Sequence, residues 1–157
     1  MKKRIIHICV LVTILLLLIY FIALPIIKWN INYDLSSVTS GEKAVEYYLN
    51  SIDEKNPKKS LTIYPSLNEY DSKPGIFGYS LIEYCKIINI EEISDDYNDL
   101  TDDGEKLYMA EFSWRFAFGE SPNAFISLSD GDCILFFKAT KNIETGNWYI
   151  LDSYTGI

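Results

Sequence analysis

The chain begins with one long apolar run. From Ile5 to Ile27 no residue carries a formal charge, whereas basic residues precede the run and Lys28 follows it. A helix of that length measures about 34 Å, enough to cross a hydrocarbon core about 30 Å thick. The pattern therefore predicts a transmembrane helix over residues 5–27.

The flanks of this run predict its orientation. A cleaved signal peptide has an apolar core of about 7–15 residues and small residues at its cleavage site, and neither feature is present. Basic residues cluster from Lys2 to Arg4, and only Lys28 follows the run closely, so the N-terminus is expected in the cytoplasm. We expect an uncleaved, single-pass cell-membrane protein that contacts the lipid bilayer through residues 5–27.

The pattern divides the chain into three parts. Residues 1–28 are predicted to be the cytoplasmic tail and transmembrane anchor, residues 29–40 a tether, and residues 41–157 one extracytoplasmic domain. Apolar residues of the domain first recur at the helical spacing i, i+3, i+4 and i+7. Thr39 or Ser40 can cap this helix. Its apolar stripe consists of Val45, Tyr48, Leu49 and Ile52.

A second, shorter helix follows the first. Asn56 is suited to cap it and Pro57 to occupy its first position. Pro65 ends this helix. Residues 65–79 hold two Pro and two Gly, so a long loop is expected there.

The rest of the domain reads as antiparallel strands. Alternating or apolar stretches over residues 80–93, 105–120, 132–140 and 148–154 predict four strands, and residues 123–129 are a candidate short edge segment. Two helices followed by long strands predict an α+β domain, in which both helices pack on one face of a curved antiparallel sheet.

The second predicted strand carries a nearly continuous aromatic stripe on one face. Core beneath the helices is the favoured interpretation, and the wall of a ligand pocket is the alternative. The stripe consists of Tyr108, Ala110, Phe112, Trp114, Phe116 and Phe118.

Two phrases carry a resemblance to a known fold. The helix phrase "AVEYYLNSIDEKNPKKSL" and the closing strand "GNWYILDSYTG" enclose the long strands. This order, over residues 41–156, resembles the cystatin-like or nuclear-transport-factor-two-like fold, also called ketosteroid-isomerase-like. More narrowly, it is similar to membrane-anchored bacterial members of unknown function. The resemblance implies helices on a curved sheet and, in the members that are enzymes, a cavity with Tyr and Asp around a small ligand.

Charge and histidine content exclude several classes of function. Residues 29–157 hold ten basic and 22 acidic residues, a net charge of −12. Such a domain repels phosphate backbones, so nucleic acid is not expected as a partner. The only histidine, His7, precedes the outer domain. Catalysis by a Ser-His-Asp or Cys-His arrangement and histidine-based zinc sites are therefore excluded there.

An acidic loop, "SDDYNDLTDDGEK", separates the first two predicted strands. Asp99 and Asp103 have the spacing that begins an EF-hand loop, but the position of the bidentate Glu falls on Ala110. A solvated hairpin connection is the better interpretation. We expect neither a metal site nor a cofactor.

Two cysteines fall within the outer domain. Outside the cell a bridge between Cys85 and Cys133 is permitted. Both residues lie in apolar strand-like stretches, where a thiol acts as a small hydrophobe, so separate thiols are favoured.

The closing strand and the only outer arginine supply candidates for a ligand site. Strand alternation places Trp148, Ile150 and Asp152 on one face. Arg115 lies mid-strand and is expected to pair with Glu111 or Asp152. The candidate ligand-pocket residues are Phe112, Trp114, Arg115, Trp148 and Asp152.

These observations predict a non-enzymatic binding module near the membrane surface, with a protein partner or a second copy as possible ligands. One alternative is a scaffold subunit of a membrane-spanning secretion or conjugation complex. The other is a small-molecule isomerase or dehydratase that uses Tyr and Asp.

Overall fold

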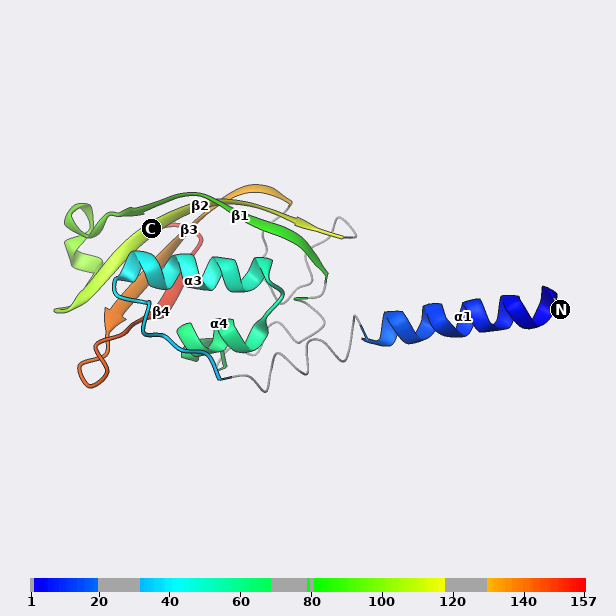
Figure 1. The fold of residues 1–157 in the computed structure, drawn as a ribbon. Helices are drawn as coiled ribbons and strands as arrows, with labels where there is room; N and C mark the ends of the chain where they lie inside the picture. The colour runs from blue at the N-terminus through cyan, green and yellow to red at the C-terminus, as the bar shows by residue number, and fades with distance from the viewer. Residues whose placement is uncertain (1, 20–31, 69–78, 80, 118–129) are drawn as a thin grey trace.

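The computed structural model describes residues 2–19, 32–68, 79, 81–117 and 130–157 (Figure 1). The fold is α+β, as predicted, and its sheet has four antiparallel strands. The helices are α1 (Lys2–Leu18), α3 (Gly41–Asp53) and α4 (Pro57–Ile63), and the strands are β1 (Ile82–Glu92), β2 (Glu105–Phe116), β3 (Gly131–Lys141) and β4 (Trp148–Tyr154). Short 3-10 helices are η2 (Pro65–Asn68), η3 (Ser94–Asp96) and η4 (Asn98–Leu100).

Helix α1 covers the first part of the apolar run. Within the described part of the chain, no helix combines the length and the apolarity that crossing a membrane requires. Residues 20–27 of the expected span lie outside the described residues. The transmembrane helix therefore remains a prediction.

Helix α3 forms where the helical stripe predicts it. The Ser40 side chain caps its first turn by accepting a hydrogen bond from the backbone N–H of Lys43 at 3.2 Å, so Ser40 rather than Thr39 is the cap. The stripe faces the sheet and is buried. At the other end, Lys55 has a φ of 54°, which turns the chain out of the helix.

Helix α4 also begins as predicted. Asn56 Oδ1 accepts a hydrogen bond from the Lys59 backbone N–H at 3.1 Å, and Pro57 occupies the first turn. After Tyr64 the chain continues into η2, so the first residues of the expected loop are helical. The remainder of that loop, residues 69–78, lies outside the described residues.

The strands form a simple meander in the order β1-β2-β3-β4. Both α3 and α4 lie on the same side of the sheet in Figure 1. The face toward α3 is called the inner face here, and the opposite face the outer face. The aromatic stripe of β2 lies on the inner face: Tyr108, Ala110, Phe112, Trp114 and Phe116 are all buried. Phe118 and the candidate edge segment 123–129 lie outside the described residues.

One residue of β2 departs from the simple alternation. Leu107 belongs to the outer face by position and yet is fully buried. Its backbone N–H donates to Ser94 Oγ at 3.0 Å, and its carbonyl accepts from the Ile93 N–H at 2.9 Å. These hydrogen bonds hold the chain that leaves β1 beside Leu107.

The predicted alternation of β4 is wrong in its second half. The pairing of β3 with β4 slips between Lys138 and Ala139. Ile150 lies opposite Ala139, whereas Asp152 lies opposite Lys138 and Ser153 opposite the buried Phe137. A bulge inserts an extra residue into one strand and reverses the faces that follow it. Ser153, rather than Asp152, therefore continues the inner face.

Cys85 and Cys133 are not joined by a disulfide. Cys85 of β1 pairs with Trp114 of β2, and Cys133 of β3 pairs with Phe112 of β2. Strand β2 thus separates the two cysteines. Two strand spacings amount to about 10 Å, whereas a disulfide requires Cα atoms about 5.5–6 Å apart. The topology therefore disfavours the bridge, in agreement with the favoured prediction.

Candidate functional site

The five predicted ligand-pocket residues do not meet at one point. Phe112 and Trp114 are 1% and 2% exposed and belong to the hydrophobic core. Their rings meet edge to face, with centroids 5.6 Å apart and an interplanar angle of 89°. Trp114 makes a similar contact with Phe116 at 5.0 Å. Such pairs stabilise a packed interior, so the structure places this stripe in the core.

Arg115 lies on β2 and is exposed to solvent. Its Nε is 3.3 Å from Glu83 Oε2, and the two side chains are 60% and 54% exposed. The expected pairing with Glu111 or Asp152 is wrong, because Arg115 pairs with Glu83 of the neighbouring strand β1. Asp152 lies on β4, which is not adjacent to β2. An ion pair this exposed contributes about 0–1 kcal/mol.

Asp152 does contact a tyrosine from the helical layer. Its Oδ1 accepts hydrogen bonds from the Tyr64 hydroxyl at 3.3 Å and from the Ser153 backbone N–H at 2.8 Å. The Tyr64 hydroxyl also lies 3.2 Å from Ser153 Oγ. Tyr64 is only 1% exposed. This Tyr–Asp contact links the end of α4 to β4 and is the closest match to the acid pair that the isomerase interpretation requires.

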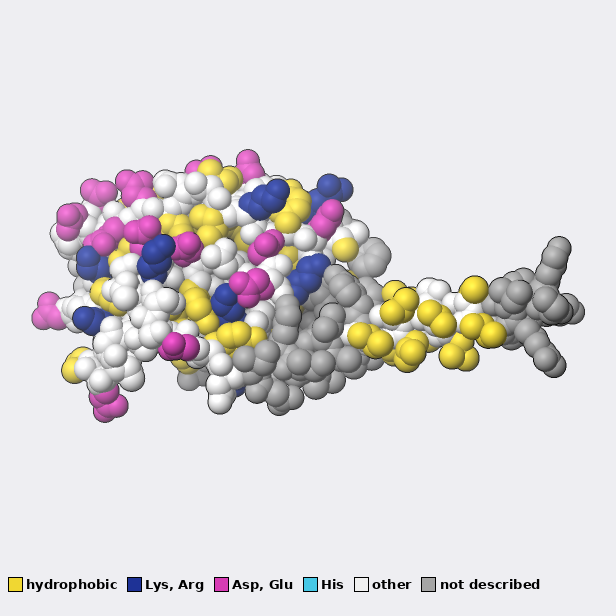
Figure 2. All heavy atoms as spheres, in the orientation of Figure 1, with side chains coloured by type: hydrophobic (Ala, Val, Ile, Leu, Met, Phe, Trp, Pro, Cys, Tyr) yellow, Lys and Arg dark blue, Asp and Glu magenta, His cyan; other side chains and the backbone are white. Residues whose placement is uncertain are grey.

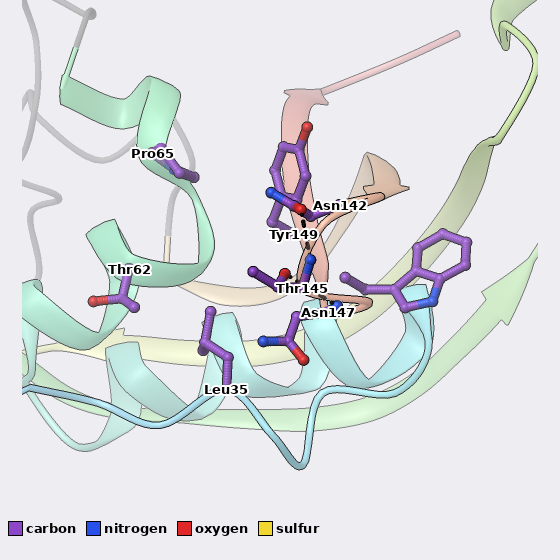
Figure 3. Close-up of a pocket in the computed structure, with 8 residues that line it drawn as sticks. Leu35, Thr62, Pro65, Asn142, Thr145, Asn147 and Tyr149 are labelled. Atoms are coloured by element: carbon purple, nitrogen blue, oxygen red, sulfur yellow. Dashed lines mark hydrogen bonds between the residues drawn. The ribbon is translucent and has the colours of Figure 1, made fainter.

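Trp148 borders an open cavity of about 290 Å³, which we call the β4 groove. Thr62 and Pro65, from α4 and η2, form one side, and Leu35 lies at the base (Figure 3). The opposite side is formed by the turn from β3 to β4 and the start of β4. It comprises Asn142, Thr145, Asn147, Trp148 and Tyr149.

Hydrogen bonds fix the turn side of the β4 groove. Asn142 Oδ1 accepts from the backbone N–H groups of Glu144 at 2.9 Å and Thr145 at 3.0 Å, and Gly146 completes the turn with a φ of 75°. Such side-chain-to-backbone bonds give a turn a defined shape. The walls are therefore preformed rather than dependent on a ligand.

The β4 groove could not be predicted from the sequence. From the sequence, the residues between the last two strands predict only a turn, and Leu35 falls within the predicted tether. In the structure Val38 is 1% exposed and its carbonyl accepts from the Trp148 backbone N–H at 3.2 Å. This hydrogen bond fixes the segment against the edge of β4, and only tertiary packing reveals it.

Charge is distributed unevenly over the domain. The eight residues that line the β4 groove are all uncharged. Acidic side chains gather instead at the end of the molecule that carries η3 and η4 (Figure 2). This loop connects antiparallel β1 and β2, as predicted for a hairpin connection. Within the described ranges, no three His, Cys, Asp or Glu side chains are placed to hold a metal ion.

A second candidate surface lies on the outer face of the sheet. Ile134 is 48% exposed, and Met109 and Phe136, which pair across β2 and β3, are half-buried. These three residues are called the outer patch. Exposed apolar side chains grouped on one face indicate an interaction surface more strongly than single scattered ones do.

The buried tyrosines are placed for packing. Burial raises the pKa of Tyr48 and Tyr79 well above its usual range, so both hydroxyls stay protonated at neutral pH. Tyr48 meets the rings of Tyr64 and Phe137 edge to face at 5.6 and 5.7 Å. These contacts join α3 and α4 to β3.

The buried Cys85 thiol predicts how the free energy of unfolding changes at alkaline pH. Burial first, and then the nearby Asp53 carboxylate, raises the pKa of the Cys85 thiol from 9.0 to about 12. Because folding raises this pKa, the protonated thiol contributes its full stability to the folded state below pH 9. As the pH rises from 9 toward 12, the thiol ionises in the unfolded chain but not in the folded one, so this contribution to the free energy of unfolding is lost. Three pKa units correspond to about 4 kcal/mol. We expect Cys85→Ala to flatten the fall in unfolding free energy between pH 8.5 and 11, measured by chemical denaturation. Equal slopes in the variant and the parent would contradict this assignment.

The sequence was also compared with known proteins. No protein-family model matches it, and no curated protein or solved structure does so either.

Proposed function

We propose that this chain is a membrane-anchored, non-enzymatic binding module with an extracytoplasmic domain of the cystatin-like type. The apolar run at the N-terminus supports the anchor, and the basic residues before it support the orientation. Two helices on one face of a four-stranded meander support the fold type. The single observation that carries the binding function is the outer patch, because it leaves Ile134 48% exposed on an open sheet.

The charges around the outer patch favour one kind of partner. Glu91 and Glu111 pair across the sheet with Met109 and Ile134, whereas Lys138 is engaged with Glu105 at 3.2 Å. The whole outer domain carries a net charge of −12. A second copy would present the same acidic surroundings and be repelled, so we infer a basic protein as the partner.

Site-specific photo-crosslinking of the full chain in a bacterial membrane tests this function. Benzoylphenylalanine at Phe136, on the outer patch, is expected to form an adduct with a basic protein. Adding Ile134→Lys is expected to lower the adduct yield at least about tenfold, because the interface would bury a positive charge that repels a basic partner. The matched control position is Tyr47, a half-buried aromatic residue of α3. Equal adducts from both positions, or only crosslinked copies of this chain, would contradict the proposal.

The scaffold interpretation differs in its dependence on the anchor. If the chain is a subunit of a membrane-spanning complex, replacing residues 5–27 by an unrelated apolar helix is expected to reduce complex formation. A binding module that uses the outer patch alone is expected to keep its adduct after the same replacement. The crosslinking assay therefore distinguishes the two.

One observation favours the enzymatic alternative, namely the hydrogen bond between the Tyr64 hydroxyl and Asp152. A buried tyrosine of this kind can donate to a developing oxyanion. However, Asp152 also accepts from the Ser153 backbone, and Tyr64 is almost completely buried. A reacting group has little access to the pair in this arrangement, so we rank the enzyme below the binding module.

A further inference from the structure

We propose that the β4 groove is a binding site for a neutral sugar, such as one or two units of a glycan chain. The groove lies at the edge of the sheet, on residues different from the outer patch. This inference goes beyond the proposed function and does not depend on the crosslinked partner. It rests on the shape, the charge and the hydrogen-bonding groups of the groove.

The chemistry of the lining excludes an ionised ligand. No lining residue is charged, although acidic residues outnumber basic ones 22 to ten in the outer domain. An anionic ligand would meet an acidic domain without a basic side chain to pair with, and a cation would find no carboxylate in the lining. A neutral molecule needs no charged partner, so an uncharged lining does not weaken its binding.

The polar groups that are present match hydroxyl groups. Asn147 contributes a carboxamide that donates and accepts, whereas the Thr62 hydroxyl donates to the Lys58 carbonyl at 2.8 Å. Within the described part of the chain, no hydrogen bond engages the Asn147 side chain, whereas Asn142 Oδ1 is used to hold the turn. Sugar hydroxyl groups also donate and accept, so neighbouring hydroxyl groups of one sugar can pair with both the carbonyl and the amino group of the Asn147 carboxamide.

The walls of the groove suit a sugar ring. Tyr149 and Pro65 lie on opposite sides of it (Figure 3), and Leu35 provides an apolar base. The C–H groups of a sugar ring pack on aromatic and proline faces while its hydroxyl groups point to the rim. A volume of about 290 Å³ is at the small end for ligand sites. It suits one or two sugar units rather than a large cofactor.

An added peptide strand is a poorer occupant, because the edge of β4 is already engaged. The Trp148 backbone N–H donates to the Val38 carbonyl at 3.2 Å. The Leu151 carbonyl accepts from Ser66 Oγ at 2.6 Å. A peptide that extends a sheet requires unpaired backbone groups along an edge strand. One N–H and one carbonyl of β4 are thus already engaged, and a peptide strand would have to displace both contacts.

Glycan-array binding of the full chain tests the proposal. The chain is held in micelles of a detergent without a sugar headgroup, so that the detergent does not compete. We expect binding to a subset of neutral glycans. Calorimetry with the tetramers of β-1,4-linked N-acetylglucosamine and α-1,4-linked glucose then measures the affinity. Asn147→Ala and Tyr149→Leu are each expected to weaken binding at least about tenfold, the effect of losing one hydrogen bond or one ring contact.

The matched control is Asn50→Ala, which removes an exposed carboxamide from α3 on a different surface. It is expected to change the affinity by less than about twofold. Thermal unfolding of each variant checks that the fold is intact. The proposal is overturned if no neutral glycan binds, if only acidic glycans bind, or if the groove variants bind as the parent does. Loss of the crosslinked partner in Ile134→Lys with retained glycan binding would separate this site from the outer patch.

Discussion

Phe112→Ala is expected to lower the free energy of unfolding by about 3–5 kcal/mol. The Phe112 ring is 1% exposed, lies at the centre of the inner face and contacts the Trp114 ring edge to face. Truncation removes the buried ring and leaves a cavity in the hydrophobic core that the neighbours can only partly fill. Chemical denaturation of the full chain in micelles measures the change.

The neighbouring Arg115 provides the control for this prediction. Its side chain is 60% exposed, so Arg115→Ala is expected to change stability by no more than about 0.5 kcal/mol. If Phe112→Ala does not fold, Phe112→Leu keeps most of the volume and is expected to cost less than about 1.5 kcal/mol. A loss below 1 kcal/mol for Phe112→Ala would instead indicate that this face is an open pocket wall.

The fold could be predicted from the sequence because its signals are local and repeated. The spacing of Val45, Tyr48, Leu49 and Ile52 specifies one face of a helix, and the alternation along β2 specifies one face of a strand. Each signal is set by several residues at once, so a single irregular position does not change it. The order of two helices and four strands then leaves few topologies.

The candidate site could not be predicted in the same way. The position of Asp152 depends on a bulge opposite Lys138, and no residue type in "WYILDSY" marks that bulge. The partner of Arg115 depends on which strand lies beside β2 and on its register. Leu35 reaches the β4 groove only because the preceding segment packs on the sheet edge. All three features are set by tertiary contacts between residues distant in sequence.

Gly41→Ala is expected to destabilise the protein by about 1–3 kcal/mol, although alanine is the better helix former. A Cβ at position 41 would lie 2.7 Å from Cζ and the hydroxyl oxygen of Tyr108, closer than van der Waals contact allows. The Tyr108 ring is 2% exposed, and its hydroxyl donates to Glu92 Oε2 at 3.3 Å, so it has little room to move. Thermal or chemical unfolding of the variant measures the loss.

Gly156→Ala is the matched control, because no atom beyond its two chain neighbours lies within 4 Å of the added Cβ. A change within about 0.5 kcal/mol is expected there. The double variant Gly41→Ala with Tyr108→Leu tests the cause, since removing the ring also removes the clash. The two changes should then be less than additive, by at least about 1 kcal/mol. Additive losses would show that the ring does not limit position 41. Less than additive losses would instead show that the close approach of α3 to β2 depends on Gly41, a residue whose local sequence indicates only the start of a helix.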